Sequence, residues 1–176
     1  MKRILALVST AIVIALLSFS AGTALADQGY HTERLPVHSA AAGYPLRNGM
    51  VVNIHTNGTT NFAVEEYNLN GAKPNTTYHL VREFQESLLG QIPGWAPLYT
   101  GFDLQTDKNG NGNCNIKVLV AQVAPLIEFG QTDLHVKIVF IEGGTLVGIG
   151  PGMFLVVGGT EAYSTEVTEI QFDAKR

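Results

Sequence analysis

The stretch Leu-His-Val-Lys-Ile-Val-Phe-Ile-Glu, residues 134–142, decides the fold class of this chain. Its first five positions alternate between apolar and polar residues, and a period of two is typical of a β-strand with one buried face. The β-branched residues in the stretch also favour a strand. We therefore predict a strand whose inward side chains are Leu134, Val136, Ile138 and Phe140, with His135 and Lys137 on the polar face.

Seven more segments of this kind lie between clusters of Gly, Asn and Pro. They are residues 50–56, 62–69, 77–84, 98–106, 113–122, 153–157 and 167–173. Further side chains predicted to point inward are Leu98, Phe102, Leu104, Thr168, Ile170 and Phe172. Many short strands with turns between them predict an all-β protein built as an antiparallel sandwich.

The segment 77–84 has a second interpretation. Its apolar residues and Leu88 also recur at helical spacing, which allows a short helix there. Thr76, Thr77 and Tyr78 favour extended structure, so we predict a strand over 77–84 and allow a helical turn around 86–89.

The first 26 residues have the pattern of a secretory signal peptide. Lys2 and Arg3 precede an apolar run over residues 4–19, and Ala24 and Ala26 form a small-residue cleavage site. The alternative, a membrane anchor, needs about 20 apolar residues, and this run is shorter. We therefore predict cleavage before Asp27, export from the cytoplasm, no membrane association afterwards, and one domain over residues 27–176.

Composition narrows the class of protein. The chain has 176 residues, of which 45% are hydrophobic and 15% charged, with a single cysteine, so disordered, collagenous and disulfide-stapled classes are excluded. Loss of Lys2 and Arg3 would leave 9 basic residues against 15 acidic ones, a formal charge of -6. That sign is wrong for a protein that grips a phosphate backbone, so we expect no nucleic-acid partner.

The run Leu-Asn-Gly-Ala-Lys-Pro-Asn-Thr-Thr-Tyr, residues 69–78, resembles the Leu-x-Pro-x-Thr-x-Tyr corner of fibronectin type III and related immunoglobulin-like domains. Ala72 stands where the family has Leu, and more strands follow Tyr78 than the family's usual order allows, so strand order is left open. The resemblance implies an immunoglobulin-like antiparallel β-sandwich of about seven to nine strands. It also implies that Pro74 presets a turn, that Asn75 caps it, and that Tyr78 buries its ring while its hydroxyl bonds to upstream backbone.

Residues 107–112 match the first half of a D-x-N-x-N-G calcium loop. Asp107, Asn109 and Asn111 would supply oxygen ligands at alternate positions. The twelfth position, where a bidentate Glu normally closes the site, is Val118, so calcium binding would be weak. The alternative is a hairpin turn whose Gly and Asn residues tolerate a positive φ.

Histidines provide a second candidate for a metal site. None of the five has H-E-x-x-H spacing, so a site would have to be assembled across strands from His55, His79, His135 and nearby carboxylates. The alternative is that these histidines are hydrogen-bonded or face solvent.

Cys114 lies in a segment whose alternation places it on one face with Ile116 and Val118. This pattern predicts a buried thiol that packs as a small hydrophobe. An intermolecular disulfide or a nucleophile is the alternative, but Lys117, the nearest cation in sequence, lies on the opposite face.

Residues 143–160 carry no charge and are rich in glycine. Because glycine is a poor helix former, this composition favours a hairpin from Thr145 to Val157, with its turn at residues 150–152, rather than a membrane helix. Met153, Leu155 and Val157 would point one way, and Phe154 and Val156 the other. A strand that is apolar on both faces needs cover on both, so we predict self-association or a partner here.

No catalytic motif accompanies these features, since the serines lie outside any G-x-S-x-G context. The leading hypothesis is an exported, non-enzymatic binding protein without a cofactor, whose protein or glycan ligand contacts end loops or an edge strand. The alternative is a secreted enzyme or metal protein with the histidine site. Asn57 and Asn75 are N-x-T acceptors, and their glycosylation depends on the host.

Overall fold

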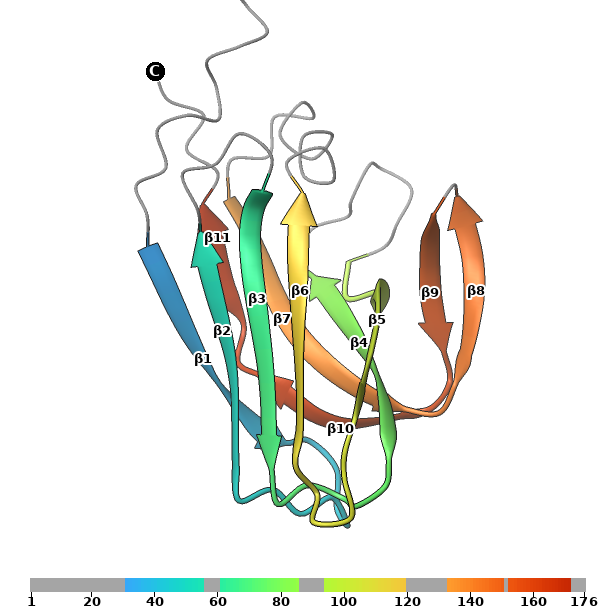
Figure 1. The fold of residues 1–176 in the computed structure, drawn as a ribbon. Helices are drawn as coiled ribbons and strands as arrows, with labels where there is room; N and C mark the ends of the chain where they lie inside the picture. Colours follow the sequence, from blue (N-terminus) through green and yellow to red (C-terminus); the bar gives the residue numbers. More distant parts are fainter. Residues whose placement is uncertain (1–30, 56–60, 86–93, 120–132, 151, 172–176) are drawn as a thin grey trace, which may run out of the picture.

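The computed structural model describes residues 31–55, 61–85, 94–119, 133–150 and 152–171, and these contain eleven β-strands (Figure 1). The strands are β1 (His31–Ser39), β2 (Asn48–His55), β3 (Asn61–Asn70), β4 (Thr77–Phe84), β5 (Leu98–Gln105), β6 (Gly112–Leu119), β7 (Asp133–Glu142), β8 (Thr145–Gly150), β9 (Met153–Val157), β10 (Thr160–Thr165) and β11 (Thr168–Gln171). This part of the chain has no helix that is long and apolar enough to span a membrane. The predicted signal peptide and Asn57 lie outside the described residues.

The strands form one antiparallel sheet that curls back on itself. Its order is β6-β3-β2-β1-β10-β7-β4-β5-β9-β8, and β11 pairs with β7. β1 links two halves of the sheet, because its residues 31–36 pair with β2 and its residues 37–39 pair with β10. Figure 1 shows β1, β2, β3 and β6 in front of β7, β4 and β10. We call β6-β3-β2-β1 the first half of the sheet, and the strands from β10 to β8, with β11, the second half.

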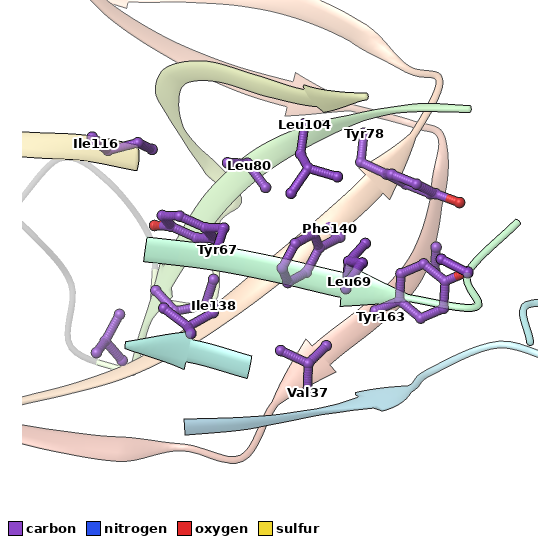
Figure 2. Close-up of a cluster of buried hydrophobic side chains, with 14 of the residues drawn as sticks. Val37, Tyr67, Leu69, Tyr78, Leu80, Leu104, Ile116, Ile138, Phe140 and Tyr163 are labelled. Carbon is purple, nitrogen blue, oxygen red and sulfur yellow. The ribbon is translucent and has the colours of Figure 1, made fainter. Parts of the chain in front are cut away.

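The core fills the space between the two halves (Figure 2). Tyr67 on β3 contacts Phe140 on β7 edge-to-face, with ring centroids 6.0 Å apart, and Phe140 contacts Tyr163 on β10 at 6.3 Å. Tyr163 in turn contacts Tyr78 on β4 at 5.4 Å. Edge-to-face pairs at these separations add to the stabilisation that burial provides.

The predicted all-β, antiparallel class is confirmed, and each of the eight predicted segments contains a strand. The 77–84 segment is β4 and not a helix, whereas the turn at 86–89 lies outside the described residues. Val136, Ile138 and Phe140 are buried as predicted. The structure does not describe the side chains of Leu134, Ile170 and Phe172.

Two strands, β1 and β10, were not predicted. The sequence of β10 lacks the alternation of apolar and polar residues that identifies a strand. The register shifts between Glu161 and Tyr163, so that the adjacent Ala162 and Tyr163 are both buried. β1 contains a proline and two charges among its first six residues, which removes the usual strand composition.

The inward placement of Phe102 is wrong, since this side chain is 44% exposed. β5 bulges against β4: Tyr99 pairs with Val81, but Asp103 pairs with His79, so β5 uses more residues than β4 over the same distance. A bulge changes which side chains face the core. Leu98 and Leu104, on either side of it, both keep their inward positions.

The corner between β3 and β4 follows the predicted chain path but uses a different tyrosine. Pro74 lies in the turn, and Asn75 adopts a φ of 50°, which asparagine tolerates. The Tyr78 ring is fully buried as expected, but its hydroxyl has no hydrogen-bond partner among the described residues. Tyr163 takes that role: its hydroxyl accepts from the Lys73 backbone N–H at 3.0 Å and donates to the Pro45 carbonyl at 3.0 Å.

The predicted hairpin over 145–157 is confirmed as β8 and β9, which continue the β7–β10 pair beyond a sharp bend. Paired glycines make the bend. A Cβ on Gly144 would lie 2.9 Å from the Gly158 carbonyl oxygen, and Gly144 has a φ of +92°. Beyond the bend, β9 reaches the edge of β5, where Leu155 pairs with Leu98.

Candidate binding cleft

A cleft of about 800 Å³ lies where the outer face of β2, β3 and β6 meets the β5–β6 turn and the β3–β4 corner. In Figure 1 both connections lie at the lower end of the molecule. Strand register brings distant residues together there, since Asn68 pairs with both Met50 and Asn113, and Asn48 pairs with Asn70. The lining consists of Asn48, Met50, Asn68, Leu69, Asn70, Asn75, Gln105, Thr106, Asp107, Asn111, Gly112 and Asn113.

Uncharged amides dominate this lining. Asn48, Asn68, Asn70 and Asn113 are exposed, and none of them bonds through its side chain to another described residue. Each primary amide offers two N–H donors and one carbonyl acceptor. The lining contains no Lys or Arg, and its one ionisable side chain is Asp107. The cleft therefore presents a dense, nearly neutral set of hydrogen-bonding groups.

The turn that forms one wall is held by its own backbone. One oxygen of the Asp107 carboxylate accepts from the backbone N–H groups of Asn109 and Asn111, both at 2.8 Å. These two bonds lower the pKa of Asp107. Gly110 packs so closely against the corner that a Cβ would lie 2.0 Å from the Ala72 carbonyl oxygen. Only glycine fits at this position.

Thr106 joins the turn to the β3–β4 corner. Its hydroxyl donates to the Lys73 carbonyl at 2.7 Å and accepts from the Thr76 backbone N–H at 3.0 Å. The Asn75 backbone N–H adds a bond to the Asp107 carbonyl at 3.0 Å. Two connections far apart in sequence thus form one continuous wall of the cleft.

Asn111 provides a hydrogen-bond acceptor in the wall that no described residue uses. Its side-chain oxygen is buried and has no partner among the described residues. A buried acceptor without a partner costs roughly 1–3 kcal/mol, so such atoms often mark places that water or a ligand completes.

The residues of the predicted calcium loop lie in this wall, but in a different role. The Asp107 oxygen that would face a cation accepts backbone N–H groups, and Val118, at the twelfth position, is buried in the core. Across the described ranges, no three His, Cys, Asp or Glu side chains are grouped to hold a metal ion. Calcium binding by Asp107, Asn109 and Asn111 stays a prediction without structural support.

The predicted histidine site is dispersed. His79 Nδ1 lies 2.8 Å from Asp103 Oδ1 on the outer side of β4, and the Tyr99 hydroxyl donates to the same oxygen at 2.9 Å. Burial, together with this hydrogen bond, raises the pKa of Tyr99 to about 12. His135 lies six residues along β7 from Ile141, the partner of His79, which corresponds to about 20 Å of strand. His79 and His135 therefore cannot share one metal ion. The side chain of His55 lies outside the described residues.

Cys114 lies beside Tyr67 in the register of β3 and β6, and it packs against the core. Burial raises the pKa of its thiol, which lowers its nucleophilicity at neutral pH. The thiol thus packs against the core, but Cys114 is only partly buried, whereas the sequence predicted a buried thiol.

Sequence reasoning missed a polar cluster between the two halves of the sheet. Arg82 on β4 binds the Glu65 carboxylate on β3 through Nη2 at 2.5 Å and Nε at 3.3 Å. The Tyr67 hydroxyl donates to Glu65 at 2.5 Å. Alternation along β3 does place Glu65 with the inward Ala63 and Tyr67, but nothing local identifies Arg82 as its partner. This cluster ties the halves together and lies away from the cleft.

Comparisons of the chain with protein-family models, with curated proteins and with solved structures found no match.

Proposed function

We propose that this chain is an exported, non-enzymatic binding protein, an immunoglobulin-like β-sandwich that holds a neutral glycan in its amide-lined cleft. The observation that carries the proposal is the gathering of six asparagines and Gln105 around one cleft that no Lys or Arg lines. Export rests on the signal peptide predicted from residues 1–26.

The chemistry of the amides favours hydroxyl-rich ligands. A sugar hydroxyl both donates and accepts hydrogen bonds, and one primary amide can accept through its carbonyl oxygen and donate through its N–H groups. An anionic ligand would lack a cation in the lining and would meet the carboxylate of Asp107. An apolar peptide would find only Met50 and Leu69 as large apolar contacts. A neutral glycan satisfies most of the lining with the fewest unpaired groups.

The wall formed by the turn and the corner supports binding because it is already ordered. Its side-chain and backbone hydrogen bonds fix Asp107, Thr106 and Asn111 without a ligand. A site that is fixed in advance loses less conformational entropy when its ligand arrives.

The test is calorimetric titration of the purified protein with neutral oligosaccharides, namely β-linked glucose, N-acetylglucosamine and mannose hexamers. We expect one of them to bind, and Asn68→Ala or Asn113→Ala to weaken that binding about 5- to 30-fold through lost hydrogen bonds. Asn115→Ala is the matched control, since Asn115 is exposed on the same face of β6 but lies outside the lining.

Two results would contradict the proposal. One is that no neutral oligosaccharide binds. The other is that Asn115→Ala weakens binding as much as Asn113→Ala does, which would place the ligand elsewhere on the sheet face. Selection of a peptide that competes for the same asparagines would overturn the glycan as ligand while keeping the cleft.

A further inference from the structure

The β8–β9 hairpin exposes an unusual amount of apolar side chain. Nine large hydrophobic residues are exposed in the described part of the chain, and five of them belong to this hairpin. They are Leu146, Val147, Ile149, Phe154 and Val157.

Both faces of the hairpin contribute. Register pairs Leu146 with Val156 and Gly148 with Phe154 on one face, and Val147 with Leu155 on the other. Val156 is buried, because it packs against Val81, Val139 and Ile141 on the outer side of the second half of the sheet. The remaining apolar groups on β8 have no such cover among the described residues.

β8 is also a terminal strand of the sheet. It pairs with β9 on one side, and no other strand of the described residues pairs with it. Natural proteins protect such edges with Lys, Pro, covering loops or bulges. β8 has a register shift between Gly148 and Gly150, but residues 145–148 form a regular stretch without a charge.

A second copy of this chain fits the edge better than an unrelated strand. An added strand must be apolar on both faces and uncharged, and β8 itself has both properties. Antiparallel pairing of two identical strands is self-complementary about a twofold axis, so each apolar contact occurs twice. Without residues 1–26, each copy has a formal charge of -6, and the charge-free hairpin is where two like-charged molecules can approach with least repulsion.

We infer that the free edge of β8 is a self-association surface, at which β8 of a second copy adds antiparallel along residues 145–148. The sheet then continues from one molecule to the next, in the order β9-β8-β8-β9. Leu146 and Val147 lie near the centre of the pairing, where each gains apolar side-chain neighbours from the second copy on its own face of the sheet. The surface is separate from the asparagine cleft, which is formed by β2, β3, β6 and their connections, so either proposal can fail without the other.

Analytical ultracentrifugation of the purified protein tests this inference. We expect a concentration-dependent dimer at protein concentrations up to about 0.1 mM, where weak strand pairing becomes populated. Val147→Lys should give a monomer, because Val147 is 42% exposed and a lysine at the edge blocks strand addition. Val167→Lys is the control, since Val167 is equally exposed at 46% and lies in the connection between β10 and β11.

A second variant protects the test from a folding defect. Thr145→Lys places the charge on an exposed polar residue of the same edge and removes no apolar contact. It should also give a monomer, with the wild-type urea midpoint. A wild-type protein that stays monomeric throughout the concentration range would overturn the inference. So would a dimer that survives both lysine variants, or one that Val167→Lys dissociates.

Discussion

The two terminal strands of this sheet, β6 and β8, expose edges of opposite chemical character. β6 turns Cys114, Ile116 and Val118 toward the core and presents Asn113, Asn115 and Lys117 to solvent. β8 is apolar on both faces and has no charge. A polar, charged edge discourages strand addition, whereas an apolar one invites it. The comparison separates a side of the molecule suited to a polar ligand from a side suited to another strand.

Removal of the Arg82 charge should give the largest effect on stability. It tests how strongly β3, on the side of the asparagine cleft, is held to β4 through the interior. Arg82→Met leaves the buried Glu65 carboxylate without its ion-pair partner, so we expect a loss of about 3 kcal/mol in the free energy of unfolding. Urea denaturation measures it. Glu66→Gln, one residue away on the opposite face of β3, should change little, and equal losses would refute the assignment.

Substitutions in the glycine bend test whether the stability of the β8–β9 hairpin depends on the backbone conformation of the bend. Gly144→Ala forces a Cβ against the Gly158 carbonyl in a left-handed conformation, so we expect a loss of about 2–3 kcal/mol and release of Val156 from its cover. Gly143 also has a positive φ, but a Cβ there meets nothing within 4 Å. Gly143→Ala should therefore cost only about 1 kcal/mol. Thermal melts of the two variants check the order, and a reversed order would contradict this account of the bend.

The tyrosine hydroxyls probe the corner that forms part of the cleft wall. Tyr163→Phe removes two hydrogen bonds, one accepted from the Lys73 backbone N–H and one donated to the Pro45 carbonyl, and should cost about 1–2 kcal/mol. Tyr78→Phe removes a buried hydroxyl that has no partner among the described residues, so its urea midpoint should equal or exceed that of wild type. A larger loss in Tyr78→Phe than in Tyr163→Phe would restore Tyr78 to the role that the sequence resemblance implies.

Local patterns predicted what depends on neighbouring residues in the chain. Alternation predicted the strand of residues 134–142, and the charge-free glycine-rich stretch predicted the hairpin. The choice between Tyr78 and Tyr163 could not be predicted, because it depends on how β10 packs against a corner ninety residues earlier. The bulge that exposes Phe102 is likewise set by pairing with β4.

Only one part of the cleft was identified from the sequence. Asp107 and Asn111 were predicted to belong to a turn or a cation loop, whereas Asn68, Asn70 and Asn113 were not recognised as candidate binding residues. Their gathering in one cleft requires the register that pairs Asn68 with Asn113, together with the bonds that fix the turn to the corner. Both are contacts between distant residues, which no local pattern specifies.

The smallest expected effect concerns the Asp107 carboxylate, and it tests whether the cleft wall on the β6 side is held by charge. Bonds from the Asn111 and Asn109 backbone N–H groups lower the pKa of Asp107, so the ionised form is favoured in the folded state. This contribution to stability is complete above the unfolded pKa of about 4 and is lost as the pH falls through the lower folded value. The protection factors for amide hydrogen exchange at Asn109 and Asn111, which NMR measures relative to the intrinsic exchange rate at each pH, should therefore fall on acidification below that range, while those at the edge of β8 should not follow this titration. Asp107→Asn should remove the pH dependence at both positions, because an amide oxygen can still accept but does not titrate. Persistence of the same dependence in that variant would show that another group holds the wall.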